Sequence, residues 1–372
     1  MDAFNIEERH KVTGANIKAV GVGGGGGNMI AHMVEEGIEG IELIVANTDS
    51  QALSTSPAHI KIQLGEKTTR GLGAGMKPEI GKEAALESYD EIKAHLEGAD
   101  IVFISAGMGG GTGTGAAPII AQAAKEVGAL TISVVTKPFK FEGRRRARLA
   151  EEGINELKKE SDSIVVIPNE KLLSIVDRSL GIRNSFKIVD DVLSRAVSGI
   201  SGVILSYGKN DINLDFADVQ TVMSHRGLAL MGVGEAQGEN SAYEAIKSAV
   251  ESPLLDNMSI NGAMGVLVHF TIHPDYPLVD IGDAMEVVYE SADEDAHVIF
   301  GTTTNENMAP DQVKITLIAT GFEHEQQKEE PLQVVKTLSS ESLQQAKRRV
   351  SGGYDSSEDI LDIPTFLRKQ MD

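Results

Sequence analysis

Two glycine-rich stretches, far apart in the sequence, constrain this chain more than any other feature. The first, Gly21–Asn28, directly follows the apolar run Ile17–Val20, and the second, Gly107–Gly115, follows Asp100–Ser105 after one alanine, Ala106. Each stretch stands where a buried parallel strand is expected to pass into a helix. Backbone N–H groups at such a junction point outward with a positive dipole, and glycine lets an anion approach closely. Together the two stretches predict a polyphosphate ligand that is held from two sides.

Short apolar runs alternate with helical patterns over the first part of the chain. The predicted strands are Ile17–Val22, Ile41–Ala46, Ile60–Leu64, Ile101–Ser105, Leu130–Val135 and Ile164–Ile167. The predicted helices are Asn28–Glu36, Pro78–Ser88, Tyr89–Glu97, Ala116–Val127 and Arg144–Glu160. Apolar strands that alternate with helices are typical of an α/β fold with a parallel sheet covered on both faces. Ligands collect at the carboxyl ends of such strands, where both glycine-rich stretches fall.

A long amphipathic helix and a second, smaller mixed α/β region follow. Apolar residues recur at three- and four-residue spacing from Ile182 to Ser206, which predicts one long helix. The second region is predicted to hold strands at Ala229–Val233, Val266–Ile272, His297–Phe300 and Val313–Thr320, and helices at Ser241–Val250 and Ile281–Glu290. The predicted organisation is a nucleotide-binding domain (1–180), a central helix (181–207) and a second domain (208–322), followed by a disordered linker (323–357) and a docking peptide (358–372). The linker is predicted from its sparse apolar residues, which cannot offset the conformational entropy of folding.

Charge and composition exclude several classes of protein. The net charge of −21 at pH 7 argues against nucleic-acid binding and against direct docking on an anionic membrane. The chain has no cysteine, which excludes disulfides and thiolate chemistry and fits a cytoplasmic protein. The first residues show no signal-peptide pattern, and no apolar run is long enough to insert into a bilayer. A role at a membrane would therefore need an adaptor.

The first glycine-rich stretch by itself allows a second interpretation. Gly21–Gly26 satisfies the G-x-G-x-x-G pattern of dinucleotide-binding domains, which would make the chain an oxidoreductase. A P-loop is excluded, because the Lys-Ser/Thr ending of that motif is absent. The second glycine-rich stretch has no role in a dinucleotide site, and the second strand ends in Asn47-Thr48-Asp49 rather than simply in an acidic residue. Both features weaken the dinucleotide interpretation.

Four separate motifs resemble those of one known family. Gly109–Gly115 reads Gly-Gly-Gly-Thr-Gly-Thr-Gly, the signature of tubulin-like GTPases, and Gly23–Asn28, Thr136–Arg144 and Asn213–Val219 match further motifs in family order. The chain therefore resembles the tubulin/FtsZ family, and within it the bacterial cell-division GTPases. This resemblance implies a tubulin/FtsZ-like fold, GTP and GDP as ligands, GTP hydrolysis, and head-to-tail polymerisation into filaments of the cytokinetic ring. A tubulin-like regulator that binds GTP without polymerising is the alternative.

The resemblance also assigns GTP-binding roles to individual residues. Those implied for the phosphates are Gly24, Gly25, Gly26, Gly27, Asn28, Gly111, Thr112 and Gly113, with Gly73, Ala74 and Gly75 sensing the γ-phosphate. Glu142 and Arg146, expected on one helix face because they are four residues apart, are implied for the ribose and its surroundings. Those implied for guanine are Asn169, Phe186 and Asp190, the last as acceptor of the two N–H groups on the base edge. Asp191 follows directly, and the sequence leaves open which of the two carboxylates faces the base.

Asn213, Asp215 and Asp218 are the expected catalytic residues. Two carboxylates three positions apart at a loop-to-helix junction suit water activation, although such pairs are also common as a charge preference of helix N-termini. In the family that this chain resembles, the loop projects into the nucleotide pocket of the neighbouring subunit. The resemblance therefore implies that hydrolysis depends on assembly. No metal bound directly by protein side chains is expected; Mg²⁺ would be held mainly through the phosphates, and a monovalent cation is a further candidate.

The end of the chain is predicted to be a docking peptide. Its apolar residues follow a polar tether, which is how a chain presents a short binding segment. By the same resemblance, this segment would bind a membrane anchor and other division proteins, and would hold the protein at the division site beneath the inner membrane. The residues expected to dock are Leu361, Asp362, Ile363, Pro364, Phe366 and Leu367.

Overall fold

The computed structural model describes residues 15–172, 181–205, 216–224, 227–255, 260 and 262–322. These residues fall within one compact unit, residues 1–323. Asn213, Asp215, the predicted linker and the predicted docking peptide lie outside the described residues. The side chain of Phe186 is also outside them, although its backbone belongs to a described helix.

The first lobe is a parallel sheet in the strand order β3-β2-β1-β4-β5-β6. Its strands are β1 (Ile17–Val22), β2 (Ile41–Asn47), β3 (Ile60–Gln63), β4 (Ile101–Gly107), β5 (Leu130–Lys137) and β6 (Ser163–Pro168). Its helices are α1 (Gly23–Glu35), α2 (Ser50–Thr55), α3 (Glu66–Thr69), α4 (Pro78–Glu87), α5 (Tyr89–Leu96), α6 (Thr112–Glu126), η1 (Lys140–Glu142), α7 (Arg144–Glu160) and α8 (Asn169–Leu172). The predicted parallel sheet is confirmed.

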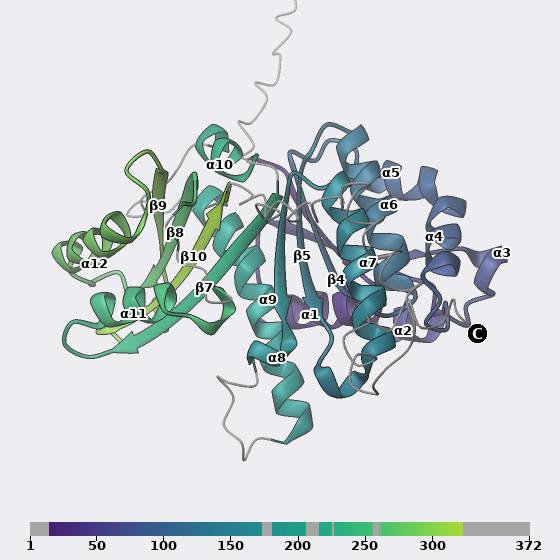
Figure 1. Cartoon of the computed structure of the whole chain (residues 1–372), viewed down its shortest axis with the longest axis horizontal. Helices are drawn as coiled ribbons and strands as arrows, with labels where there is room; N and C mark the ends of the chain where they lie inside the picture. The colour runs from purple at the N-terminus through teal and green to yellow at the C-terminus, as the bar shows by residue number, and fades with distance from the viewer. Residues whose placement is uncertain are drawn as a thin grey trace, which may run out of the picture. The chain divides into compact units, whose positions relative to one another are not determined.

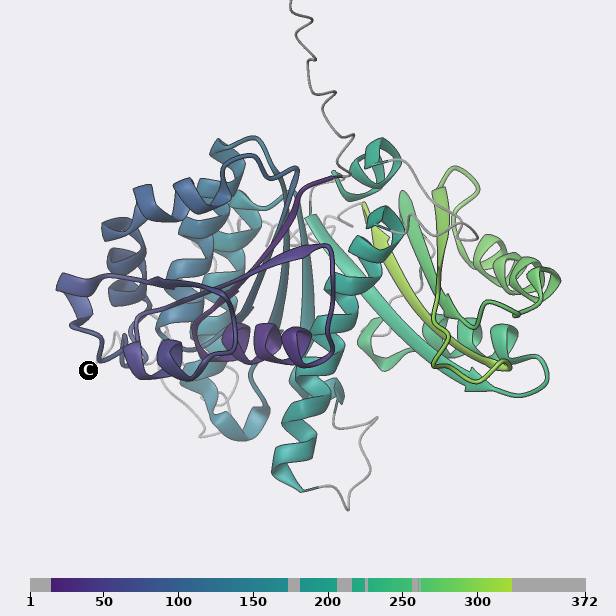
Figure 2. The ribbon, with the colours of Figure 1, turned by 180° about the vertical axis from the view of Figure 1, so that it is seen from behind.

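Helices cover both faces of this sheet. Along β1, Ile17 and Ala19 belong to the core that also contains α1 and the long helix α9 (Ile182–Leu205). Val20 and Val22 belong to the opposite core, which is built with α4, α5, α6 and α7. Figure 1 views the sheet with α6 and α7 in front, and Figure 2 views it with α1 in front. This two-sided burial explains why the strands read as continuous apolar runs.

The second lobe continues the same sheet with antiparallel and parallel strands. Its elements are α10 (Phe216–Met223), β7 (Gly227–Gln237), α11 (Ser241–Val250), η2 (Pro253–Leu255), β8 (Gly265–Ile272), α12 (Leu278–Ser291), β9 (His297–Thr304) and β10 (Gln312–Thr320). The first residues of β7 pair with β6, Gly227 opposite Ser163, and its remaining residues pair with β10. One strand thus joins the two lobes into a sheet of ten strands.

The long helix α9 contacts both lobes. It packs against α1, α8 and β5 in the first lobe and against β8, β9 and β10 in the second. Its 24 residues span about 36 Å at the usual rise per residue. The helix therefore contacts elements on both sides of the junction between the two lobes.

Two helices begin earlier than their periodicity predicts. We expected a helix from Asn28, and α1 begins at Gly23; we expected one from Ala116, and α6 begins at Thr112. Glycine has a low helix propensity, so a pattern-based prediction excludes it. In the structure α1 nevertheless includes these glycines, and its first residue, Gly23, has a positive φ of 71°. The consequence is that most of the first glycine-rich stretch, and the end of the second from Thr112, form the first turns of helices.

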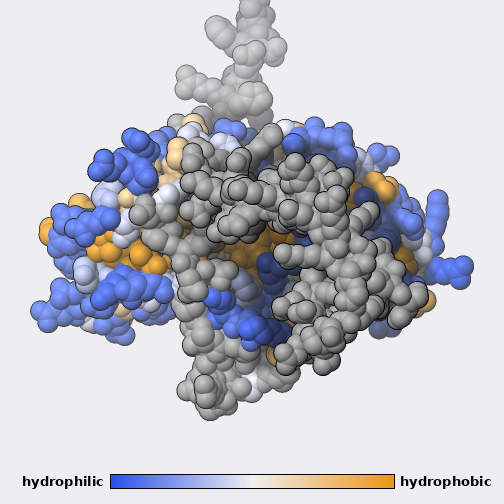
Figure 3. Space-filling view, viewed as in Figure 1, coloured by the Kyte–Doolittle hydropathy of each residue, from blue (hydrophilic) through white to orange (hydrophobic). Residues whose placement is uncertain are grey.

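Most of the described surface visible in Figure 3 is hydrophilic, in keeping with the high net charge. Apolar residues gather over the region where α11 and α12 lie in Figure 1. On α12 the exposed large apolar residues are Leu278, Val279 and Tyr289. Within the described residues, no helix combines the length and the apolar character that crossing a membrane requires.

Candidate nucleotide-binding site

The two glycine-rich stretches lie against each other at the carboxyl edge of the sheet. A Cβ atom added to Gly23 would lie 2.9 Å from the backbone nitrogen of Gly113, and one added to Gly25 would lie 3.0 Å from that of Gly107. β1 and β4 are neighbouring parallel strands, so the helices that follow them start side by side. Only glycine allows this approach of two backbones.

Both helices start without a side-chain cap. Neither the N-cap residue of α1, Val22, nor that of α6, Gly111, forms a side-chain hydrogen bond to its helix, and neither first turn contains an acidic residue. The first N–H groups of each helix therefore lack intrahelical partners and carry the positive end of the helix dipole. Two such ends that start side by side are suited to binding phosphate groups.

A third segment completes this edge. The backbone nitrogen of Gly73 donates to the carbonyl oxygen of Thr48 at 3.3 Å, and a Cβ added to Gly111 would lie 2.8 Å from Cβ of Ala74. The predicted γ-phosphate segment, residues 73–75, is therefore adjacent to the second glycine-rich stretch. The buried hydroxyl of Thr48 also lies 2.6 Å from that of Thr112.

Sequence patterns alone did not place Thr48 among the site residues. The signal was present, because Asn47-Thr48-Asp49 is a polar run directly after a buried strand, at the edge where ligands collect. In the sequence analysis this run serves only as an argument against a dinucleotide-binding domain.

Glu142 and Arg146 form an ion pair, but they do not share a helix as we expected. Glu142 ends the short turn η1, and Gly143, with φ of 97°, separates it from α7, which carries Arg146. The second oxygen of Glu142 accepts a hydrogen bond from the backbone nitrogen of Phe139 at 2.9 Å. A Cβ added to Gly109 would lie 2.7 Å from the carbonyl oxygen of Arg146. The pair is thus beside the second glycine-rich stretch.

Asn169 has a side-chain atom without a partner in the described part of the chain. The residue follows β6 at the start of α8, it is buried, and its Oδ1 atom forms no hydrogen bond there. A buried polar atom left unpaired costs about 1–3 kcal/mol, so such an atom is usually satisfied by an ordered water, an ion or a ligand. The role near the base that the family resemblance implies for Asn169 stays a prediction.

Asp190 and Asp191 have different environments on α9. Asp191 pairs with Arg195 at 2.9 Å and lies 3.6 Å from Nε2 of His32. Burial raises the pKa of Asp190 to about 6, against an opposing effect of His32. Asp191 is therefore engaged within the protein, while Asp190 is the carboxylate that an added hydrogen-bond donor would stabilise.

Asp218 lies near the amino ends of the parallel strands, whereas the glycine-rich stretches lie at their carboxyl ends. It is in the first turn of α10, and α10 leads into β7, whose Gly227 pairs with Ser163 at the amino end of β6. The carbonyl oxygen of Val222 in α10 accepts a hydrogen bond from Thr320 at 2.6 Å. Figure 1 shows α10 at one end of the strands and α8 at the other. The structure thus brings the glycine-rich stretches, residues 73–75, Glu142 and Arg146 together, and separates Asp218 from them.

Comparisons with known proteins agree with this architecture. The model of the Tubulin/FtsZ family GTPase domain matches residues 16–177, and that of the FtsZ family C-terminal domain matches residues 227–323. The Cell division protein FtsZ of Helicobacter pylori (strain J99) is 48% identical over 362 residues, covering 96% of this chain and 93% of that relative.

Solved structures agree as well. An FtsZ dimer from M. jannaschii has a TM-score of 0.79 at 46% identity, covering 83% of this chain and 89% of its own. CetZ1 from Haloferax volcanii, 18% identical, shares the fold with a TM-score of 0.70, covering 82% of this chain and 94% of its own. The matching models account for both lobes, and the identity extends over nearly the whole chain. We conclude that this chain belongs to the tubulin/FtsZ family of GTPases and, within it, to the FtsZ family.

Proposed function

We propose that this protein binds and hydrolyses GTP and polymerises head-to-tail into filaments of the bacterial division ring. The names of its relatives support the role in cell division, and a solved FtsZ dimer supports self-assembly. The GTPase-domain match supports the activity. The match to the tubulin/FtsZ family contradicts the oxidoreductase interpretation.

GTP would be held at the carboxyl edge of the parallel sheet. The first turns of α1 (Gly24, Gly25, Gly26, Gly27 and Asn28) and of α6 (Thr112 and Gly113), with Gly111, would bind the phosphates, while Gly73, Ala74 and Gly75 would sense the γ-phosphate. Glu142 and Arg146 would contact the ribose and its surroundings. Their ion pair would partly open, which lets one pair serve both the empty and the loaded site.

Guanine would be recognised at the start of α9. A carboxylate at Asp190 accepts from both N–H groups on the base edge of guanine, and adenine offers no such pair of donors. The two new hydrogen bonds would stabilise the charged form that burial disfavours. Oδ1 of Asn169, which has no partner among the described residues, would supply a further acceptor, and Phe186 would stack on the base. The engagement of Asp191 with Arg195 supports Asp190 as the residue that faces the ligand.

The observation that carries the catalytic proposal is the separation of Asp218 from the phosphate edge. A carboxylate at the amino edge of the sheet cannot activate water at the carboxyl edge of the same molecule. In a head-to-tail contact the amino edge of one copy faces the carboxyl edge of the next, so Asp218, with Asp215 and Asn213, would complete the neighbour's site. Repeating this contact without closure produces a filament.

Other parts of the proposal rest on the family resemblance. Mg²⁺ would be held through the phosphate oxygens, with a monovalent cation as a further candidate. The C-terminal segment, residues 358–372, would bind a membrane anchor and other division proteins, which would place the protein in the cytoplasm at the division site. The same proposal includes the domain boundaries. The nucleotide-binding domain would end at residue 180, the central helix at 207, the second domain at 322 and the linker at 357.

The decisive experiment measures phosphate release from GTP against protein concentration, with light scattering recorded in parallel. Hydrolysis completed by a neighbour requires both signals to appear at the same threshold concentration. Release that is strictly proportional to concentration, without scattering, would show a complete site in each monomer. GTP binding with neither signal would favour the regulator that does not polymerise.

The variant Asp218→Ala tests the shared site directly. We expect GTP binding to remain and the turnover rate to fall by about 10²–10⁴, the usual contribution of a positioned general base. Asp280→Ala is the matched control, because Asp280 is also an acidic residue in the first turn of a helix, in α12. Normal turnover by Asp218→Ala polymers would contradict the proposed mechanism.

A further inference from the structure

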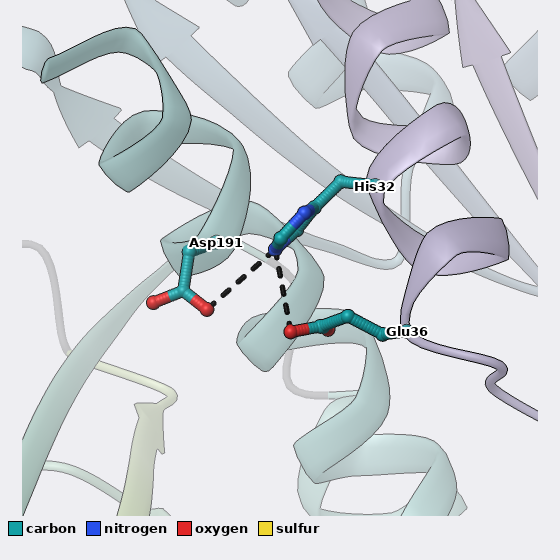
Figure 4. A group of neighbouring side chains, drawn as sticks. All are labelled: His32, Glu36 and Asp191. Atoms are coloured by element: carbon teal, nitrogen blue, oxygen red, sulfur yellow. Dashed lines mark ion pairs between the residues drawn. The ribbon is translucent and has the colours of Figure 1, made fainter. Parts of the chain in front are cut away.

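A histidine and two carboxylates meet where α1 packs against α9. Nε2 of His32 lies 3.4 Å from Oε1 of Glu36 and 3.6 Å from Oδ1 of Asp191. Figure 4 shows the imidazole pointing from α1 toward both carboxylates, one from its own helix and one from α9. The three ligand atoms all lie within 4.8 Å of one another.

The imidazole nitrogen at the centre of this cluster is buried and faces both carboxylates. The side chain of His32 is 10% exposed, and its Nε2 atom forms no hydrogen bond within the described residues. Hydrogen bonds between nitrogen and oxygen have lengths of about 2.7–3.2 Å, so both carboxylate oxygens stand somewhat too far away. A buried ring nitrogen aimed at two carboxylates across such gaps is a second observation, besides the clustering, that indicates a ligand.

The distances fit a metal ion better than direct contacts. In a tetrahedral site with bonds of about 2.0–2.1 Å, neighbouring ligand atoms lie about 3.4 Å apart. The separations of Nε2 from the oxygens of Glu36 and Asp191 are close to this edge length. The two carboxylate oxygens also lie within 4.8 Å of each other, so all three atoms are within reach of one ion.

The other oxygen of each carboxylate is held by a neighbour on α9. Oδ2 of Asp191 pairs with Nε of Arg195 at 2.9 Å, and Oε2 of Glu36 accepts a hydrogen bond from the hydroxyl of Ser194 at 3.3 Å. These contacts leave one oxygen of each carboxylate facing His32. Partners of this kind orient metal ligands and contribute about 10–100-fold to affinity.

We propose that His32, Glu36 and Asp191 bind a divalent transition-metal ion of the Zn²⁺ class. One imidazole nitrogen with two carboxylate oxygens suits Zn²⁺, whereas Mg²⁺ and Ca²⁺ prefer oxygen ligands alone. The side chains of Glu36 and Asp191 are 44% and 28% exposed, which leaves room for water as a fourth ligand. They also line a cleft of about 740 Å³, which provides a route of entry.

This site is separate from the Mg²⁺ expected at the phosphates, and it departs from our expectation that no metal is bound directly by protein side chains. An ion here would connect α1, which begins at the first glycine-rich stretch, to α9, which carries Asp190. The ion would therefore act as a clamp between the phosphate-binding and base-binding parts of the pocket.

The test measures Zn²⁺ affinity of the full chain by competition with a chromophoric chelator, in excess Mg²⁺. We expect one site that is weakened at least about tenfold in Glu36→Gln, which keeps the shape of the side chain but loses the charged ligand. Glu39→Gln is the matched control, because Glu39 lines the same cleft outside the cluster and the substitution removes the same charge. Its affinity should equal that of the unmodified chain.

A spectroscopic measurement tests the geometry. Co²⁺ in place of Zn²⁺ should give the intense visible absorption of tetrahedral coordination, and His32→Gln should abolish it. Equal Zn²⁺ affinity of Glu36→Gln and Glu39→Gln would overturn the proposal, as would the absence of Zn²⁺ binding by the unmodified chain. The cluster would then be only a set of side chains packed where α1 meets α9. If His32→Gln fails to fold, the comparison of Zn²⁺ affinity between Glu36→Gln and Glu39→Gln still tests the proposal.

Discussion

At the scale of single residues, neighbours in the sequence have unrelated environments. Asp190 is half-buried with a raised pKa, while Asp191 is paired with Arg195. Sequence patterns place both on one helix but do not choose between them, because the choice depends on which side chains of other elements lie alongside. The same limit applies to Asn169, because only its surroundings in the folded chain show that its Oδ1 atom has no partner among the described residues.

His269 provides a pH-dependent test of stability at this scale. It is buried in β8, its Nε2 lies 2.9 Å from the hydroxyl of Thr303, and burial lowers its pKa to about 4. The unfolded chain, with a histidine pKa near 6.5, takes up the proton first as the pH falls. The contribution of neutral His269 to the free energy of unfolding is therefore complete above about pH 6.5 and is lost as the pH falls toward 4.

The measurement compares urea unfolding at pH 7.5 and pH 5.5 in the unmodified chain and in His269→Asn. The unmodified chain should lose about 1 kcal/mol more than the variant over this interval. The comparison subtracts the titration of all other groups. Equal losses in the two proteins would show that His269 is protonated in the folded state as readily as in the unfolded one.

At the scale of elements, the interior of each helix and strand was predictable and several ends were not. Arg144–Glu160 and Ser241–Val250 form the predicted helices with the predicted bounds. Their apolar periodicity is strong, and periodicity is a property of the sequence itself. By contrast, the starts of α1 and α6 depend on backbone packing between glycines, which leaves no periodic signal.

The contact between α4 and α6 leads to a prediction at this scale. A Cβ added to Gly81 in α4 would lie 2.4 Å from the carbonyl oxygen of Gly111, just before the first turn of α6. Gly81→Ala should therefore displace the second glycine-rich stretch, lower the free energy of unfolding by about 1–3 kcal/mol and weaken GTP binding. Chemical denaturation and nucleotide titration would measure both effects.

Gly282→Ala in α12 is the matched control for this prediction. Gly282 is also inside a helix, and a Cβ added to it would meet nothing within 4 Å. Alanine should stabilise the protein there by about 0.5–1 kcal/mol, because it restricts the unfolded chain. If the two substitutions had the same effect, close packing of α4 on α6 would not be the cause.

At the scale of the whole molecule, net charge governs how filaments would associate. Each chain carries −21 at pH 7, so parallel filaments of such chains concentrate negative charge. We predict that lateral bundling needs divalent cations, and that Mg²⁺ or Ca²⁺ increases the protein in a low-speed pellet severalfold more than a monovalent salt of equal ionic strength. Bundling that did not respond to divalent cations would contradict this prediction.

The sequence by itself determined the class of fold and the phosphate-binding edge. Apolar runs that alternate with helical patterns require a parallel sheet buried on both faces, and glycine-rich stretches after two of the runs locate the ligand. These are local properties, carried by residues close together in the chain. The motifs also indicated the family, because each motif is a continuous stretch of sequence and their order along the chain is fixed.

Only the tertiary structure decided how distant segments meet. It joined the two lobes through β7, placed α10 at the edge of the sheet opposite the glycine-rich stretches, and brought His32 of α1 to Asp191 of α9. Each arrangement depends on packing between elements that are far apart in sequence, which no local pattern encodes. The proposals for a shared catalytic site and for a metal clamp both originate in contacts or separations of this kind.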